Sequence, residues 1–329
     1  MSRNMWTWAR LAGVAATFGV LVWRLGTGPF IDGARTVDGQ ALAAAAGIAV
    51  LITVSCAWRW KIVARGLGID LPLPAAVGAY YRSQFLNVTL PGGVVGDVHR
   101  GYSHGRDVSD VNRGLRAVAW ERSAGQLVQA VLTVVVLIAL PSPVRSWMPV
   151  VAIALGVAVL GILLLARVRP AAGRSRWTRV RNTVTADIRD GLLARRAWLA
   201  IMLLSAVALG GSAVTFMIAA RTAGTNASVS RMLPLALLVM LAMVLPSVAG
   251  WGPREGVTAW AFAAAGLGAD RGVATAVVYG IMVFVASLPG AAFLVLGWFR
   301  RMRLERRPEP SLPARVKVAV RRPDGAPHA

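Results

Sequence analysis

The stretch that decides the fold reads Leu90-Pro91-Gly92-Gly93-Val94-Val95-Gly96-Asp97-Val98-His99-Arg100, and a similar one reads Leu245-Pro246-Ser247-Val248-Ala249-Gly250-Trp251-Gly252-Pro253-Arg254-Glu255. Both begin with Leu-Pro, continue through glycines and place an arginine near a carboxylate. Proline removes a backbone donor and glycine weakens a helix, so a helix cannot run smoothly through either stretch. Each stretch therefore predicts two helices separated by a break, and their likeness indicates two related halves.

These breaks lie in a chain with the composition of a membrane protein. It has 329 residues, of which 56% are hydrophobic, and several apolar runs approach about twenty residues, enough to cross a bilayer. In hydrocarbon, broken backbone is tolerated only where protein buries it or water reaches it, and charges there are functional candidates. We therefore expect the working site at the residues that break the helices: Pro91, Gly92, Gly93, Gly96, Pro246, Gly250, Gly252 and Pro253.

The apolar runs predict an all-α, polytopic membrane helical bundle. Six full spans are expected at residues 11–23, 41–58, 123–140, 148–166, 197–219 and 272–299. Residues 74–100 are expected to form a re-entrant hairpin, followed by an amphipathic helix on the membrane surface over residues 107–122. Residues 232–249 and 257–267 are expected to form a second re-entrant hairpin that enters from the opposite side, as in an inverted repeat. The alternative is eight full spans.

Basic residues set the expected orientation. The net charge is +22, but the cations gather between and after apolar runs, which favours a role in topology over nucleic-acid binding. Nine arginines in residues 167–196 predict a cytoplasmic loop that joins the halves 11–166 and 197–299 of a single transmembrane domain, residues 1–299. The basic tail, residues 300–329, is expected to be cytoplasmic and disordered. The chain is thus predicted to be a multi-pass protein of the cell membrane with both termini in the cytoplasm.

The charged residues at the breaks are the candidate binding site. Arg100 and Arg254 can each present a planar guanidinium to a lipid phosphate, and Asp97 and Glu255 can hold these arginines when no lipid is bound. The alternative is a pair of internal ion pairs that only offset the cost of burial. Trp58-Arg59-Trp60-Lys61 is interpreted as a plain interface anchor.

Catalytic chemistry is not expected from this sequence. Four residues near the first break, Asp97, His99, His104 and Asp107, do not have the spacing of a zinc site. No histidine–carboxylate arrangement stands out that would make a nucleophile of Ser83, Ser103 or Ser123. We therefore expect no metal, no cofactor and no enzymatic activity.

The ordered motifs resemble the lysylphosphatidylglycerol synthase transmembrane region, a flippase-like family of integral membrane proteins. The resemblance rests on the two break stretches, on Phe85-Leu86-Asn87, on Glu121-Arg122, and on Trp58-Arg59-Trp60 followed by Gly66-Leu67-Gly68. It adds Asn87, Glu121 and Arg122 to the expected headgroup site. Two positions depart from the family pattern, since Gly125 and Gln126 stand where a carboxylate is expected and Trp251 stands where glycine is usual.

The resemblance implies transport of a lipid. In family members with a soluble synthetase domain, the membrane region moves the aminoacylated phospholipid that this domain makes, and no such domain follows here. The sequence thus predicts a translocator for an anionic or aminoacylated phospholipid or a polyprenyl-phosphate lipid, which is the expected partner. The alternative is a non-transporting subunit that recruits a separately encoded glycosyltransferase or lipid-modifying enzyme. Nucleic acid is not an expected partner.

Overall fold

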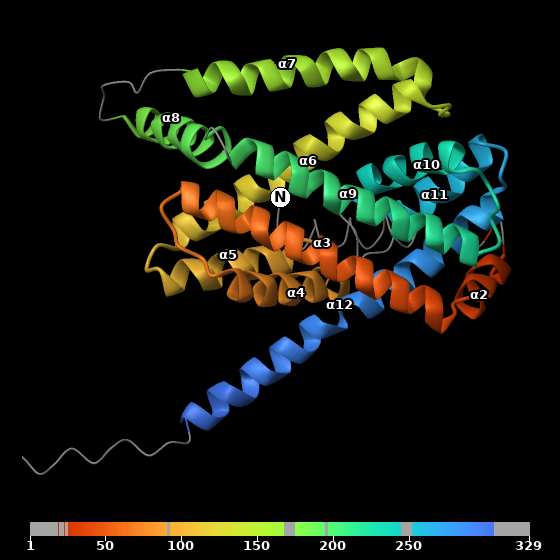
Figure 1. Ribbon diagram of the computed structural model, residues 1–329, viewed down its shortest axis with the longest axis horizontal. Coiled ribbons are helices and arrows are strands. Elements are labelled where there is room, and N and C mark those ends of the chain that lie inside the picture. Colours follow the sequence, from red (N-terminus) through yellow and green to blue (C-terminus); the bar gives the residue numbers. More distant parts are fainter. Residues whose placement is uncertain are drawn as a thin grey trace, which may run out of the picture. The chain divides into compact units, whose positions relative to one another are not determined.

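The computed structural model describes Gly19, Trp23 and residues 26–305, apart from residues 91–92, 168–174, 195–196 and 245–251. No strand occurs in this part of the chain, which confirms the all-α prediction. Residues up to Phe293 belong to one compact unit, and α12 continues as a helix into a second unit that begins at Leu294. The elements are α2 Gly28–Arg35, α3 Gly39–Gly66, α4 Leu73–Thr89, α5 Val95–Asp107, α6 Val111–Ala139, η1 Arg145–Trp147, α7 Met148–Arg167, α8 Arg176–Ala186, η2 Asp187–Leu192, α9 Ala197–Thr222, α10 Val229–Ala242, α11 Pro253–Ala264 and α12 Ala269–Glu305 (Figure 1).

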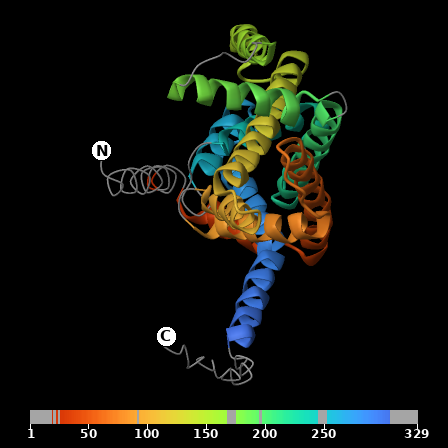
Figure 2. The same cartoon turned by 90° about the vertical axis from the view of Figure 1, so that its left-hand side faces the viewer.

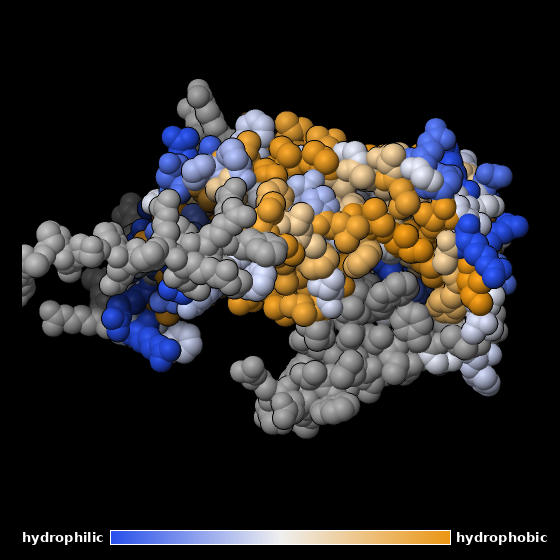
Figure 3. All heavy atoms as spheres, turned by 90° about the horizontal axis from the view of Figure 1, so that it is seen from below, coloured by the Kyte–Doolittle hydropathy of each residue, from blue (hydrophilic) through white to orange (hydrophobic). Residues whose placement is uncertain are grey.

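Among the described residues, five helices are long and apolar enough to cross a membrane, and they coincide with five of the six predicted spans: 39–66, 111–139, 145–167, 197–222 and 269–298. The remaining predicted span, residues 11–23, falls outside the described residues except for Gly19 and Trp23. The chain is therefore a polytopic membrane protein. One surface view agrees, because its hydrophobic residues gather between two hydrophilic ends (Figure 3).

Two helical hairpins fill the positions that the sequence predicted. The four helices have 17, 13, 14 and 12 residues, which correspond to lengths of about 18 to 26 Å and fall short of an apolar layer of about 30 Å. In each hairpin, the start of the first helix lies close to the end of the second helix. Arg231 Nη2 of α10 donates to the Ala265 carbonyl just after α11 over 2.7 Å, and residues at the start of α4 and the end of α5 line one small pocket. These lengths and contacts favour re-entrant hairpins over eight full spans.

The first hairpin starts at one end of the bundle, and the second hairpin starts at the opposite end. Helices α3 and α9 pack together in antiparallel order, because Arg59 contacts Ser205 while Ile52, earlier in α3, lies against Gly211, later in α9. The first hairpin follows the end of α3 and the second follows the end of α9, so they start at opposite ends of this pair (Figure 1). Each half thus has the order long helix, hairpin, long helix, as expected for an inverted repeat.

Glycines bring the hairpin helices close to their neighbours. A Cβ on Gly96 of α5 would collide with the Ser83 carbonyl of α4, and a Cβ on Gly272 of α12 would lie 2.7 Å from the Thr258 carbonyl of α11. At the second break, Gly252 has a φ of 115°, a conformation that favours glycine. Pro253 follows at the start of α11, where its missing N–H costs nothing.

Helix α7 lies at the edge of the bundle in two perpendicular views (Figures 1 and 2). Met148 is its only buried residue, and large apolar side chains are exposed along it, among them Ile153 and Val157. An exposed apolar surface of this extent is stable in lipid and unstable in water. We infer that α7 contacts the acyl chains.

One prediction about a surface segment is wrong. The amphipathic helix over residues 107–122 is not a separate surface element, because α6 runs unbroken from Val111 to Ala139; no proline interrupts it, and Glu121 is buried against other helices. The predicted loop at residues 167–196 contains α8 and a π-helical turn, η2, which packs on α3, α6 and α9.

Candidate functional site

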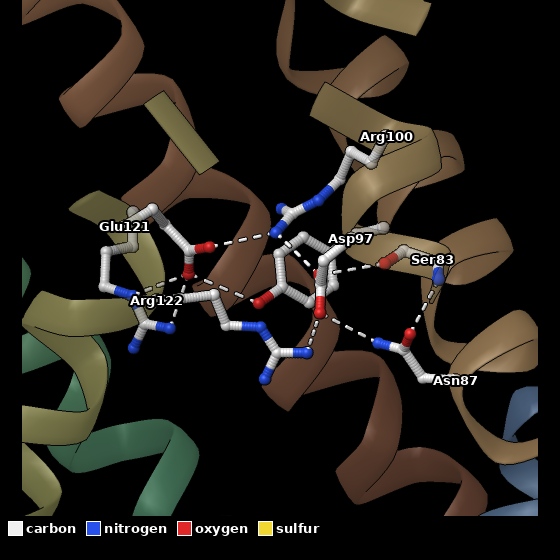
Figure 4. A network of polar contacts seen from close by, with 9 residues as sticks. Ser83, Asn87, Asp97, Arg100, Glu121 and Arg122 are labelled. Atoms are coloured by element: carbon white, nitrogen blue, oxygen red, sulfur yellow. Dashed lines mark hydrogen bonds and ion pairs between the residues drawn. The ribbon is translucent and has the colours of Figure 1, made fainter. Parts of the chain in front are cut away.

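A network of buried charges links α3, α5 and α6 (Figure 4). Glu121 of α6 has no exposed surface and accepts from two arginines, from Arg59 Nη2 over 2.6 Å and from Arg100 Nη2 over 3.0 Å. Tyr80 also donates to this carboxylate, and Arg59 donates onward to the Ser205 hydroxyl of α9. The three helices are therefore joined by charge-assisted hydrogen bonds that water does not screen.

Asp97, at the start of α5, is the second carboxylate of the network. It accepts from the Ser83 hydroxyl over 3.0 Å, from Asn87 Nδ2 over 2.9 Å and from Arg100 Nη2 over 3.0 Å, and it forms an ion pair with Arg122. Asn87 Oδ1 accepts in turn from the Gly96 N–H. Four donors match the four lone-pair positions of a carboxylate. Asp97 is therefore saturated, and it fixes the first break through both of its flanking helices.

Arg100 lies inside the protein and not on an open surface. Its guanidinium carbon is 4.4 Å from the centre of the Trp60 ring and 4.2 Å from that of Tyr80, so aromatic faces stabilise the cation. Its Nε and Nη1 have no hydrogen-bond partner within the described part of the chain. Arg100 is thus held by Glu121, Asp97 and two rings.

Arg122 is the cation of the network that reaches open space. Its side chain is 40% exposed, whereas that of Arg100 is fully buried. With three guanidinium groups, of Arg59, Arg100 and Arg122, against the carboxylates of Asp97 and Glu121, the network carries one positive charge in excess. An unbalanced charge in a low-dielectric bundle is costly, so this network favours an anion beside Arg122.

A cavity of about 820 Å³ lies beside Arg122 and receives residues from both halves. Its size is within the range of ligand pockets. Polar lining groups near Arg122 include Asn87, Ser123 and Gln126, while Ile52, Val118 and Met282 are among the apolar ones. Such a mixture suits a ligand with a charged head and an apolar body.

The second break holds a more compact charge pair. Glu255 is fully buried, accepts from the Gly252 N–H over 2.7 Å and receives Arg254 Nε over 2.7 Å. The Arg254 guanidinium lies 6.0 Å from the centre of the Tyr279 ring and against Gly280, where a Cβ would meet its atoms. Glu255 thus stabilises the N-terminus of α11.

The structure distributes the predicted site residues over three environments. Arg122, Asp97, Asn87 and Gly93 line the cavity. Arg100 and Glu121 do not line the cavity; they are buried and hydrogen-bonded to each other. Arg254 and Glu255 form a separate pair near Tyr279. The predicted pairings of Arg100 with Asp97 and of Arg254 with Glu255 are confirmed. Pro91, Gly92, Pro246 and Gly250 fall outside the described residues.

Several residues of the network were missed by the sequence analysis. Arg59 and Trp60 were interpreted as an interface anchor, but they are buried against Glu121 and Arg100 respectively. Tyr80 and Ser83 of α4 also belong to the network, and the sequence analysis assigned no role to either residue. The available signal was that polar and charged groups stand well inside these helices. In the described residues no three histidine, cysteine or acidic side chains are placed to hold a metal ion.

The chain matches the family model described as "Lysylphosphatidylglycerol synthase TM region" over residues 7–290. The matched range includes both breaks, the charge network and the cavity. No curated protein matches the chain.

Proposed function

We propose, because the chain belongs to the lysylphosphatidylglycerol synthase TM region family, that it moves an anionic phospholipid or polyprenyl-phosphate lipid between the leaflets of the cell membrane. This membership confirms the family that the sequence motifs indicated. The function is a transport step without covalent chemistry. Both termini are cytoplasmic in this proposal, since the basic residues of segments 167–196 and 300–329 favour that side.

One observation carries the proposal: the charge network has one cation in excess, and that cation, Arg122, borders a cavity between the two halves. A phosphate group placed there would accept from a guanidinium that Asp97 already orients. Apolar residues of the same cavity, such as Val283 and Ala286 of α12, can contact the acyl or prenyl chains.

The geometry also changes which arginine is expected to contact the headgroup. Arg100 and Arg254 were the first candidates from the sequence, but neither lines the cavity. Arg100 donates hydrogen bonds to Asp97 and Glu121 and so helps to hold these carboxylates in place. Arg254 lies beside Tyr279, which does line the cavity. We therefore assign the direct contact to Arg122.

The experiment that tests the proposal measures leaflet exchange of fluorescent phosphatidylglycerol in proteoliposomes, by quenching the outer leaflet with dithionite. Arg122→Gln should slow exchange by about tenfold or more, because a charge-assisted hydrogen bond contributes about 1.5 to 3 kcal/mol. Arg113→Gln is the matched control. Arg113 lies on the same helix, is similarly exposed and, like Arg122, forms an ion pair with an aspartate, in this case Asp110. Arg113 does not line the cavity.

Two outcomes would contradict the proposal. If Arg122→Gln and Arg113→Gln exchange lipid at the wild-type rate, the cavity does not carry the headgroup. If wild-type proteoliposomes exchange lipid no faster than protein-free vesicles, the chain does not translocate this lipid, and a non-transporting subunit that recruits a separate enzyme becomes the better hypothesis.

A further inference from the structure

We propose that the cavity admits lipids with a net negative headgroup and discriminates against those whose headgroup carries an added amine. The inference rests on the proposed function and names its substrate class more narrowly. It follows from the hydrogen-bond donors and the positive charge in the described cavity lining, which suit an anion, and from the state of the carboxylate and the aromatic ring there, which would otherwise bind a cation.

The cavity has no free carboxylate in its described lining. Asp97 is the only acidic residue there, and Ser83, Asn87, Arg100 and Arg122 already donate to it. The segments within residues 26–305 that the structure leaves undescribed contain no aspartate or glutamate either. A headgroup ammonium would therefore have to displace an arginine from Asp97 to find a counter-charge.

The aromatic ring in the described cavity lining already has an arginine beside it. Tyr279 is the only aromatic residue among the described lining residues, and the Arg254 guanidinium lies over its ring at 6.0 Å from the centre. A ring face attracts cations, but a second cation near this ring would be repelled by the first. The Asp97 carboxylate and the Tyr279 ring, the two kinds of group that ordinarily bind an ammonium, thus each already have an arginine as a neighbour.

The remaining polar groups of the cavity suit an anion or a neutral sugar or glycerol. Ser123, Gln126 and Gln84 can donate to phosphate or hydroxyl oxygens without a charge requirement. Together with the single excess positive charge at Arg122, they match a headgroup of one negative charge. A headgroup that carries both a phosphate and two ammonium groups has a net charge of the same sign as the network.

The test compares three fluorescent lipids in proteoliposomes of the full chain: phosphatidylglycerol, phosphatidylethanolamine and lysyl-phosphatidylglycerol. Exchange of phosphatidylglycerol should be at least about tenfold faster than that of the lysylated lipid, since each tenfold corresponds to about 1.4 kcal/mol of discrimination. Equal exchange, or faster exchange of the lysylated lipid, would overturn the inference and leave translocation itself supported.

Lipid binding to the purified protein in neutral detergent separates the two proposals. If none of the lipids exchanges faster than in protein-free vesicles, translocation fails, and a binding preference for phosphatidylglycerol of about tenfold still supports the inference. Equal binding of the two lipids would overturn it.

A charge variant tests the cause of the selectivity. Gln126→Glu adds a carboxylate to the cavity lining, brings the summed charge of the site to zero, and should reduce the preference for phosphatidylglycerol to within about threefold, or less than 1 kcal/mol. Asn112→Asp is the matched control, because it adds the same charge to the same helix at an exposed residue outside the cavity. A preference that is unchanged in Gln126→Glu, or equally reduced in Asn112→Asp, would contradict the assignment.

Discussion

At the scale of single residues, Glu121 is the group on which the buried network depends. It neutralises Arg59 and Arg100 at once, and no water reaches it. Glu121→Gln keeps the shape of the side chain but leaves the buried Arg59 with no carboxylate partner and Arg100 with Asp97 alone. We expect a loss of about 3 to 5 kcal/mol in the free energy of unfolding, because a buried charge without its partner is strongly destabilising. Thermal unfolding of the purified protein in detergent measures it.

Asp110→Asn provides the comparison for this prediction. The Asp110 carboxylate also pairs with an arginine, Arg113, but both side chains are more than a third exposed, so the expected loss is about 0 to 1 kcal/mol. Asparagine also replaces aspartate well as the N-cap of α6. Equal shifts in the two unfolding midpoints would show that the Glu121 network is not buried in the way described.

Sequence patterns predicted the local charge pairs and missed the long-range ones. Asp97 and Arg100 are three residues apart in a helix, a spacing that brings their side chains together, and Arg254 and Glu255 are consecutive in the sequence. Glu121 and Arg59 are 62 positions apart, and their contact depends on how α3 packs against α6. No local pattern carries that information.

At the scale of elements, the contact between α4 and α5 depends on Gly96. A side chain there would meet the backbone of Ser83, and backbone cannot move aside as a flexible side chain can. Gly96→Ala should lower the free energy of unfolding by about 1 to 3 kcal/mol, the usual cost of overpacking. It should also slow lipid exchange, because Asp97 is the next residue and orients Arg122.

Gly156→Ala in α7 is the control for this element. Nothing lies within 4 Å of a Cβ at Gly156, and alanine is the better helix former by about 1 kcal/mol. Its unfolding midpoint should stay the same or rise. An unchanged midpoint in Gly96→Ala would mean that the two hairpin helices are farther apart than described.

The ends of helices were predicted best where a proline prevents the helix from continuing. Pro91 and Pro253 mark the breaks whatever the surroundings, and α4 and α11 end and begin beside them. The surface helix at residues 107–122 was predicted from its arginines, but an amphipathic pattern also fits a helix whose polar face turns toward buried partners. Glu121 and Arg116 have such partners, Arg59 and Asp187, and the structure therefore continues this segment into the span.

At the scale of the whole molecule, the inverted arrangement of the hairpins predicts on which side of the membrane each turn lies. The turns next to the first hairpin should lie on one side, which we expect to be cytoplasmic, and the turns next to the second hairpin on the other. Single cysteines at Asn112, Asn226 and Ala264, all exposed, probe these places in a Cys56→Ala background, which removes the chain's only native cysteine. A membrane-impermeant maleimide applied to intact cells or to inverted vesicles reads the side of each.

We expect Asn226→Cys and Ala264→Cys to react from the same side, because α10 and α11 return to the end at which they started. Asn112→Cys should react only from the opposite side. If instead Asn226→Cys and Ala264→Cys react from opposite sides, an odd number of crossings separates them, and neither the hairpin nor the inverted repeat would hold. Such a result would also separate the cavity lining contributed by α12 and by the residues just after α10 from that of α4 and α5, so it would remove the structural basis for placing a headgroup beside Arg122.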